Sequence, residues 1–148
     1  NAMNQLLSSS KARQVLPCAY VGMDMAAGKL TYINAGGMPP LLMVGPGRLV
    51  TLDQPCLVLG VDPDYLFAAT RVDLPEAFRI VCYTDGLVEA ASAGGEALGE
   101  SRLHEALLDR DAFADASSIL TRITNTWTSH LASTQADDDA LALVIARG

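Results

Sequence analysis

The sequence predicts an α+β domain in which strands come first, two helices follow and one strand ends the chain. Short apolar runs separated by turn residues occupy much of residues 17–83. Apolar residues recur at helical spacing between residues 101 and 131, and a last apolar run covers residues 140–146. Because strands and helices are segregated along the chain, we expect a layered α+β domain and not a parallel βαβ fold.

Six strands are expected in the first part of the chain. Gly28 can supply the positive φ of a tight hairpin turn, and Gly45-Pro46-Gly47 interrupts another apolar run. Alternating charged and apolar residues at positions 71–74 predict a half-buried strand, whereas the short apolar run from Arg79 to Tyr83 predicts a strand covered on both faces. The expected strands are residues 17–25, 29–35, 41–44, 48–52, 67–74 and 79–83.

Two helices are expected after these strands. Ser101 is predicted to cap the first helix and Asp111 the second, because short polar side chains accept hydrogen bonds from the first free backbone N–H groups. The apolar stripe of the first helix is Leu103, Ala106 and Leu107. The stripe of the second is Phe113, Ala116, Leu120, Ile123, Trp127 and Leu131.

The start of the chain is interpreted separately. Asn1-Ala2-Met3 resembles the scar of a cleaved expression tag, so we assign residues 1–3 to that scar and residues 4–148 to the domain. Residues 4–14 are expected to form a short helix or a loose lead-in.

Composition narrows the class of protein. Half of the 148 residues are hydrophobic and 18% are charged, which excludes a disordered chain. No apolar run approaches the roughly 18 residues of a membrane span, and no secretory signal is recognisable, so we expect a cytoplasmic protein without a membrane partner. The formal net charge of −7 disfavours nucleic acid as a partner. The three cysteines form no C-x-x-C pair, which disfavours a zinc site.

Two acidic clusters are the candidate chemistry. Thr84-Asp85-Gly86 ends the buried strand, and Asp137-Asp138-Asp139 precedes the last strand. Carboxylates that converge on one edge would suit a hard cation such as Mg²⁺ or Mn²⁺. The alternative is structural, because Asp-Gly is a common turn and an acidic triplet is commonly a solvated loop. His104 and His130 lie on the predicted helices, where a helix surface is the simpler assignment than a catalytic triad.

An ordered series of motifs makes a resemblance visible. The stretch Tyr-Thr-Asp-Gly-Leu-x-Glu-Ala at residues 83–90 is its most specific member, and Asp138-Asp139 before an apolar strand closes the series. The other members are Leu30-Thr31-Tyr32-Ile33-Asn34-Ala35-Gly36, Pro39-Pro40-Leu41, Leu59-Gly60-Val61 and Leu98-Gly99-Glu100-Ser101-Arg102-Leu103. The series resembles the bacterial PPM-type serine/threonine phosphatases of the sporulation stage II E (SpoIIE) class, over nearly all of this chain but about the second half of the family's domain.

The resemblance implies an antiparallel β-sandwich flanked by helices, here incomplete at the N-terminus. It also implies two Mn²⁺ or Mg²⁺ ions that activate a water for hydrolysis of phosphoserine or phosphothreonine. Asp85 and Asp138 match metal ligands of the family. We expect neighbouring residues to hold these ligands in place, namely Asp139, Gly86 and Thr84.

Departures from the family pattern leave two functions open. The family's earlier ligand motifs would lie before Asn4, a usual histidine is here Gly37, and a usual threonine is here Leu141. The first hypothesis is a metal-dependent phosphatase that acts on a phosphorylated regulatory protein, of the anti-sigma-factor antagonist type, in sigma-factor or two-component signalling. The fragment alone would then be inactive. The alternative is a catalytically dead pseudo-phosphatase that serves as a protein-binding adaptor. In either case, we expect unpaired sheet edges to make the fragment self-associate.

Overall fold

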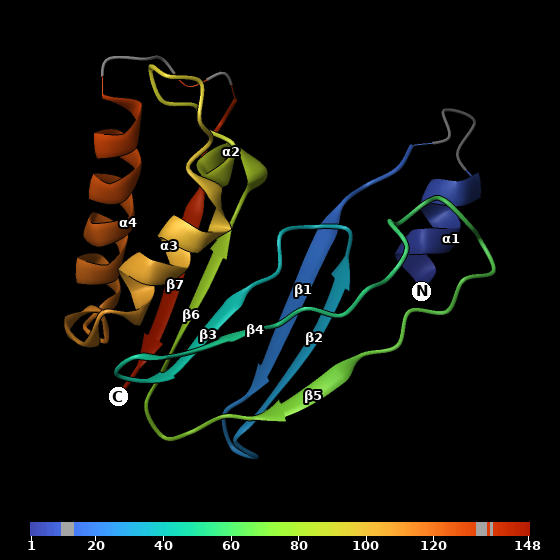
Figure 1. Cartoon of the computed structure of the whole chain (residues 1–148). Coiled ribbons are helices and arrows are strands. Elements are labelled where there is room, and N and C mark those ends of the chain that lie inside the picture. Colours follow the sequence, from blue (N-terminus) through green and yellow to red (C-terminus); the bar gives the residue numbers. More distant parts are fainter. Residues whose placement is uncertain (10–13, 133–135, 137) are drawn as a thin grey trace. The chain divides into compact units, whose positions relative to one another are not determined.

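The chain divides into two compact units (Figure 1). The computed structural model describes residues 1–9, 14–132, 136 and 138–148. Asn1–Pro39 and Leu52–Leu74 form the first unit, and Pro40–Thr51 and Pro75–Gly148 form the second. The chain therefore leaves the first unit for one hairpin, returns to it, and then completes the second.

The first unit contains helix α1 (Ala2–Ser9) and a three-stranded antiparallel sheet in the order β1-β2-β5. Its strands are β1 (Cys18–Asp24), β2 (Lys29–Ala35) and β5 (Thr70–Asp73). Gly28 adopts a φ of +61° in the β1–β2 turn, as predicted from its sequence position. Ala35, Leu59 and Phe67 form a small core in this unit.

Helix α1 is fixed to the first unit through one buried side chain. Asn4 is only 1% exposed, donates from Nδ2 to the Asp62 carbonyl (2.8 Å) and accepts at Oδ1 from the Gly60 N–H (2.8 Å). The lead-in is therefore helical at its start, and the helix includes Ala2 and Met3. The assignment of residues 1–3 to a tag scar stays a prediction.

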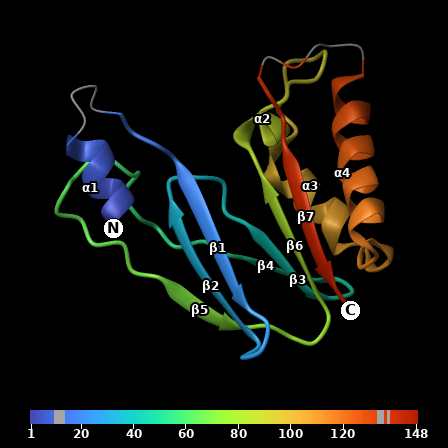
Figure 2. The ribbon, with the colours of Figure 1, turned by 180° about the vertical axis from the view of Figure 1, so that it is seen from behind.

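The second unit is built on a four-stranded antiparallel sheet in the order β4-β3-β6-β7. Helices α3 and α4 lie on one face of this sheet, and α4 runs beside β7 in both views (Figures 1 and 2). The elements of this unit are β3 (Leu41–Gly45), β4 (Arg48–Thr51), β6 (Phe78–Tyr83), α2 (Asp85–Val88), α3 (Gly99–Leu108), the 3-10 turn η1 (Arg110–Ala112), α4 (Ala116–Leu131) and β7 (Ala142–Arg147).

Strand β6 is the buried centre of the second unit. Phe78, Ile80 and Val81 are fully buried, which confirms the prediction of a strand covered on both faces. Arg79 is 7% exposed, yet its guanidinium donates to the carbonyls of Phe78, Ala114 and Arg147. Its cationic carbon also lies 4.5 Å from the centre of the Phe113 ring. These partners make a buried cation tolerable within the strand.

The predicted helix starts were wrong. Helix α3 begins at Gly99, so Ser101 lies inside it. Asp111 lies in η1, and Asp115 caps α4 by accepting from the Ser118 N–H (2.9 Å). The hydrogen bond from the Ser118 backbone, followed by that from its hydroxyl, holds the pKa of the Asp115 carboxyl below its usual value. Several acidic residues precede this helix, and the sequence pattern did not distinguish which one bonds its first turn.

The apolar stripe of α4 also differs by one position from the prediction. Ile119 and Ile123 are buried, whereas Leu120 is 41% exposed. Two apolar residues in succession left the register of the helix ambiguous. Phe113 was predicted to belong to this stripe, but it lies before the helix, and its ring contacts Arg79.

The predicted α+β class is nevertheless confirmed, because both sheets are antiparallel and the main helices follow β6. The expected strand at residues 67–74 is shorter, as β5 covers only Thr70–Asp73. Residues 85–86, interpreted as a turn, begin the short helix α2 at residues 85–88. Within the described ranges, no helix combines the length and apolarity needed to cross a bilayer.

Replacing Ile123 by alanine should destabilise the protein by about 2–5 kcal/mol, because a fully packed side chain leaves a cavity. Leu120→Ala is the matched control on the same helix and should cost less than half as much, since Leu120 is 41% exposed. The measurement is the midpoint of urea unfolding at unchanged slope. Equal losses from both variants would contradict the register of α4 described above.

We also predict that the chain self-associates through the free edge of β7. This strand ends the sheet, and Leu141 and Leu143 beside that edge are 58% and 53% exposed. Light scattering should give a mass above that of one chain, and Leu143→Lys should shift it towards the monomer. Leu66→Lys, at a residue 77% exposed in the first unit, is the control that should change nothing. A monodisperse wild-type monomer at high concentration would overturn this prediction.

Candidate functional site

The pairing of β6 with β7 brings the two acidic segments to one end of the sheet. The strands are antiparallel, and Tyr83 pairs with Ala142 as the last partners of the ladder. Residues 84–89 leave this end, and residues 138–141 enter it. Asp85 and Asp138 therefore lie on the same side of the second unit, although 52 positions separate them in the sequence.

Thr84 joins the two segments by hydrogen bonds. Its backbone N–H donates to the Leu141 carbonyl (3.1 Å), and its hydroxyl accepts from the Leu141 N–H (3.0 Å). The same hydroxyl donates to the Asp139 carbonyl (3.2 Å). Thr84 thus holds the backbone that enters β7 against the backbone that leaves β6.

Gly86 permits this close approach. A Cβ at position 86 would lie 2.6 Å from the Asp139 carbonyl oxygen and 3.4 Å from the Asp138 carbonyl carbon. Only glycine leaves room for the two backbones here without displacement. The Gly86 N–H also donates to Asp85 Oδ1 (3.0 Å), which orients that carboxylate.

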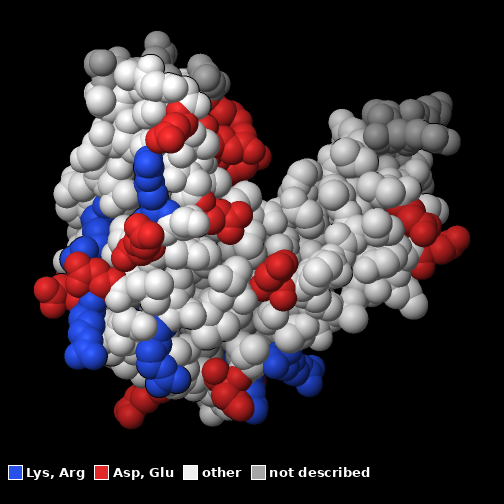
Figure 3. Space-filling view, in the orientation of Figure 1, with Lys and Arg blue, Asp and Glu red and all other residues white. Residues whose placement is uncertain are grey.

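A cavity of about 160 Å³ lies at this junction. Its acidic lining residues are Asp138 and Glu89, and Gly86, Ala90 and Ala91 complete the wall. Asp85 precedes the lining residue Gly86 and is exposed. Figure 3 shows acidic side chains gathered over the part of this unit where α2 lies.

Glu89 was not predicted as a site residue. Its N–H donates to the Asp85 carbonyl (2.8 Å), which closes one helical turn between the two acidic residues. Residues four apart lie on one face of a helix. The spacing Asp-x-x-x-Glu in the sequence could have placed Glu89 beside Asp85. Residues 85–86 were interpreted as a turn, however, and a turn does not align positions 85 and 89.

The remaining predicted site residues have distinct placements. Asp139 contributes its backbone carbonyl to Thr84, and its N–H donates to Asp138 Oδ1 (2.7 Å). Asp137 lies outside the described residues. A Cβ at Gly37, where the family pattern has histidine, would lie 3.0 Å from the backbone nitrogen of Ala19, so β1 leaves little room for a side chain.

The buried groups beneath the acidic residues carry no charge near neutral pH. Burial raises the pKa of the Cys82 thiol. Burial, and then the nearby Glu100 carboxylate, raises the pKa of the Tyr83 hydroxyl. Both groups therefore stay protonated near neutral pH.

The donor set suits a hard cation in its chemistry. Carboxylate oxygens are the ligands that Mg²⁺ and Mn²⁺ prefer. Across residues 1–9, 14–132, 136 and 138–148, however, no three His, Cys, Asp or Glu side chains are grouped closely enough to hold a metal ion.

Known proteins similar to this chain include two curated relatives. Protein IcfG of Synechocystis sp. is 27% identical over 125 residues, which are 84% of this chain and 19% of that protein. Phosphoserine phosphatase RsbP of Bacillus subtilis is 26% identical over 86 residues, which are 58% of this chain and 21% of that protein. The chain therefore spans about a fifth of the length of these relatives.

Solved structures share the fold. The SiaA-PP2C domain of Pseudomonas aeruginosa matches with a TM-score of 0.80 at 20% identity, over 99% of this chain and 57% of that one. The catalytic domain of the serine/threonine protein phosphatase PstP, in complex with two manganese ions, matches with a TM-score of 0.59 at 12% identity, over 97% of this chain and 66% of that one. These likenesses confirm the antiparallel α+β fold of PP2C phosphatase domains.

The family model described as Stage II sporulation protein E (SpoIIE) matches residues 1–148, which is the whole sequence. Together with the motif series around Asp85 and Asp138, this match confirms the predicted family. The chain belongs to the SpoIIE family, whose phosphatase domains have the PP2C fold.

Proposed function

We propose that this chain is part of a Mn²⁺- or Mg²⁺-dependent protein serine/threonine phosphatase. The observation that carries the proposal is that the β6–β7 pairing brings the segments of Asp85 and Asp138 to one end of the sheet, where Glu89 and Asp138 line a cavity of about 160 Å³. A relative named as a phosphoserine phosphatase and a matching phosphatase structure with manganese support it.

In this proposal, Asp85 and Asp138 are metal ligands and Glu89 is a further acidic group of the same site. Thr84, Gly86 and Asp139 hold the two segments together, so that the carboxylates keep their spacing. When bound, a pair of such ions supplies an activated water and stabilises charge on the transferred phosphoryl group. The protein's own contribution is to keep the carboxylates oriented.

The chain alone is proposed to be inactive. Mg²⁺ requires close to octahedral coordination by six oxygens. Among the described residues, no three His, Cys, Asp or Glu side chains are grouped closely enough to hold even one ion. We propose that ligands from the part of the domain that precedes Asn4 complete it.

The proposed substrate is a phosphorylated regulatory protein in sigma-factor or two-component signalling. The name of RsbP as a phosphoserine phosphatase favours a phosphoserine side chain as the group removed. A cytoplasmic setting belongs to the same proposal, because all three cysteines are unpaired, as is usual where thiols are kept reduced.

A second candidate function is a protein-binding adaptor without phosphatase activity. Two observations favour it: β1 crowds the position where Gly37 replaces histidine, and the side chain of Leu141 is 58% exposed where the family has threonine. A site that lacks these two side chains can still bind a partner protein through its surface although it no longer hydrolyses a substrate.

Replacing Asp85 by asparagine in the longer native protein should lower Mn²⁺-dependent hydrolysis of a phosphoserine peptide by at least roughly a hundredfold, because a charged ligand becomes neutral. Asp64→Asn, at an exposed turn of the first unit, is the matched control and should keep full activity. Equal rates for wild type and Asp85→Asn would refute the phosphatase proposal. Binding of the phosphoprotein without hydrolysis by the wild type would favour the adaptor.

Replacing Gly86 by alanine should destabilise the second unit by about 1–3 kcal/mol, since the new Cβ would lie 2.6 Å from the Asp139 carbonyl oxygen. Gly94→Ala is the control, because the nearest atom to its Cβ, the Ser92 hydroxyl oxygen, would be 3.8 Å away. Thermal unfolding measures the difference. Matching stabilities of the two variants would show that residues 86 and 139 are not in close contact.

A further inference from the structure

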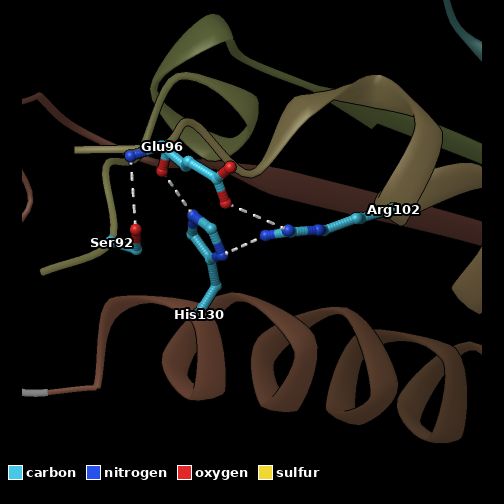
Figure 4. Close-up of polar contacts among 4 residues, drawn as sticks. All are labelled: Ser92, Glu96, Arg102 and His130. Carbon is cyan, nitrogen blue, oxygen red and sulfur yellow. Dashed lines mark hydrogen bonds and ion pairs between the residues drawn. The ribbon is translucent and has the colours of Figure 1, made fainter. Parts of the chain in front are cut away.

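A polar cluster lies outside the acidic cavity and has no part in the proposed metal ligation. It joins the loop of residues 91–97, here called the 91–97 loop, to helices α3 and α4 (Figure 4). Ser92 and Glu96 come from this loop, Arg102 from α3 and His130 from the last turn of α4.

The ring of His130 is held from two sides. Its Nε2 lies 2.8 Å from the Glu96 carbonyl oxygen, and its Nδ1 lies 2.7 Å from an Arg102 guanidinium nitrogen. A carbonyl oxygen only accepts hydrogen bonds, and a guanidinium nitrogen only donates them. Nε2 must therefore carry the proton and Nδ1 the lone pair, so the cluster requires the neutral Nε2–H tautomer.

The two contacts of His130, with Arg102 and with the Glu96 carbonyl, are here called the clamp. The 91–97 loop that the clamp holds is closed by its own backbone hydrogen bonds. The Ser92 N–H donates to the Glu96 carbonyl (2.8 Å), and the Gly95 N–H donates to the Ser92 carbonyl (2.8 Å). The Leu98 N–H donates to the Ala90 carbonyl (2.9 Å) at the base of the loop. The Glu96 carbonyl thus accepts from both Ser92 and His130, and α4 is joined directly to the loop's backbone.

The clamp reaches one wall of the acidic cavity through the base of the 91–97 loop. Ala90 and Ala91, at that base, line the cavity beside Glu89. A displacement of the loop from α4 would move the wall that carries Glu89.

We propose that Arg102 and His130 are positioning residues that fix the wall of the acidic cavity through the Glu96 carbonyl. The consequence for metal binding rests on the function proposed above, whereas the clamp itself does not. The charged groups that face the ring are the Arg102 guanidinium on α3 and, paired with it at 3.5 Å, the Glu96 carboxylate on the loop. Helix α4 places no charged residue within a turn of His130.

Protonation of His130 opposes the clamp. A proton on Nδ1 would face the N–H groups of Arg102 and add a second positive charge beside the guanidinium. Glutamine can reproduce both contacts, because its amide nitrogen donates and its amide oxygen accepts.

The first test is the tautomer of His130, read from the ¹⁵N chemical shifts of its ring in the 148-residue chain at pH 7.5. The proposal expects the Nε2–H form, and an Nδ1–H form or a charged ring at this pH would overturn it. None of these readings requires a metal, so they stand apart from the phosphatase proposal.

The second test is amide hydrogen exchange at Ser92 and Leu98, whose N–H groups close the loop. His130→Ala should speed their exchange roughly threefold to tenfold at pH 7.5. His130→Gln should keep wild-type protection at the same pH. Ser129→Ala, at the exposed neighbouring position of α4, is the control. Unchanged protection in His130→Ala, or failure of His130→Gln to restore it, would refute the positioning role.

Discussion

The register of β6 against β7 is the constraint on which the rest of the site depends. Because Tyr83 pairs with Ala142, the segment that leaves one strand and the segment that enters the other must emerge together. Thr84 then bonds both Asp139 and Leu141, and Gly86 lets the backbones approach. A slip of one residue would turn every side chain of β7 to the opposite face and separate these partners.

That register is itself secured by burial. Ile80 and Val81 are fully enclosed, so β6 cannot slide without exposing apolar surface to water. Arg79 adds directional bonds, because its guanidinium reaches carbonyls on β6, on β7 and before α4. The acidic end of the sheet therefore follows a buried, largely apolar strand. The carboxylates can be exposed to solvent while this strand keeps the distances between them fixed.

Structural features that depend on local sequence patterns were predicted from the sequence. Features that depend on tertiary contacts were not. Hairpin strands were placed well because Gly28 and the 45–47 turn punctuate period-two patterns. The predicted caps of α3 and α4 were wrong. Helix α3 follows Leu98, which makes no side-chain capping bond, and α4 is preceded by several acidic residues that the local pattern did not distinguish. Asp85 and Asp138 were recognised by their place beside strands. Glu89 and the His130 clamp were not, because each depends on a helix end or loop that no local pattern specified.

The most direct test of the central claim is paramagnetic broadening of backbone amide signals when Mn²⁺ is titrated into the 148-residue chain. One shared cation site predicts selective loss of signals from residues 84–91 together with those from residues 138–141. It also predicts that Asp138→Asn abolishes the broadening at Gly86. Broadening centred in the first unit, or an effect at Gly86 that survives Asp138→Asn unchanged, would contradict the account.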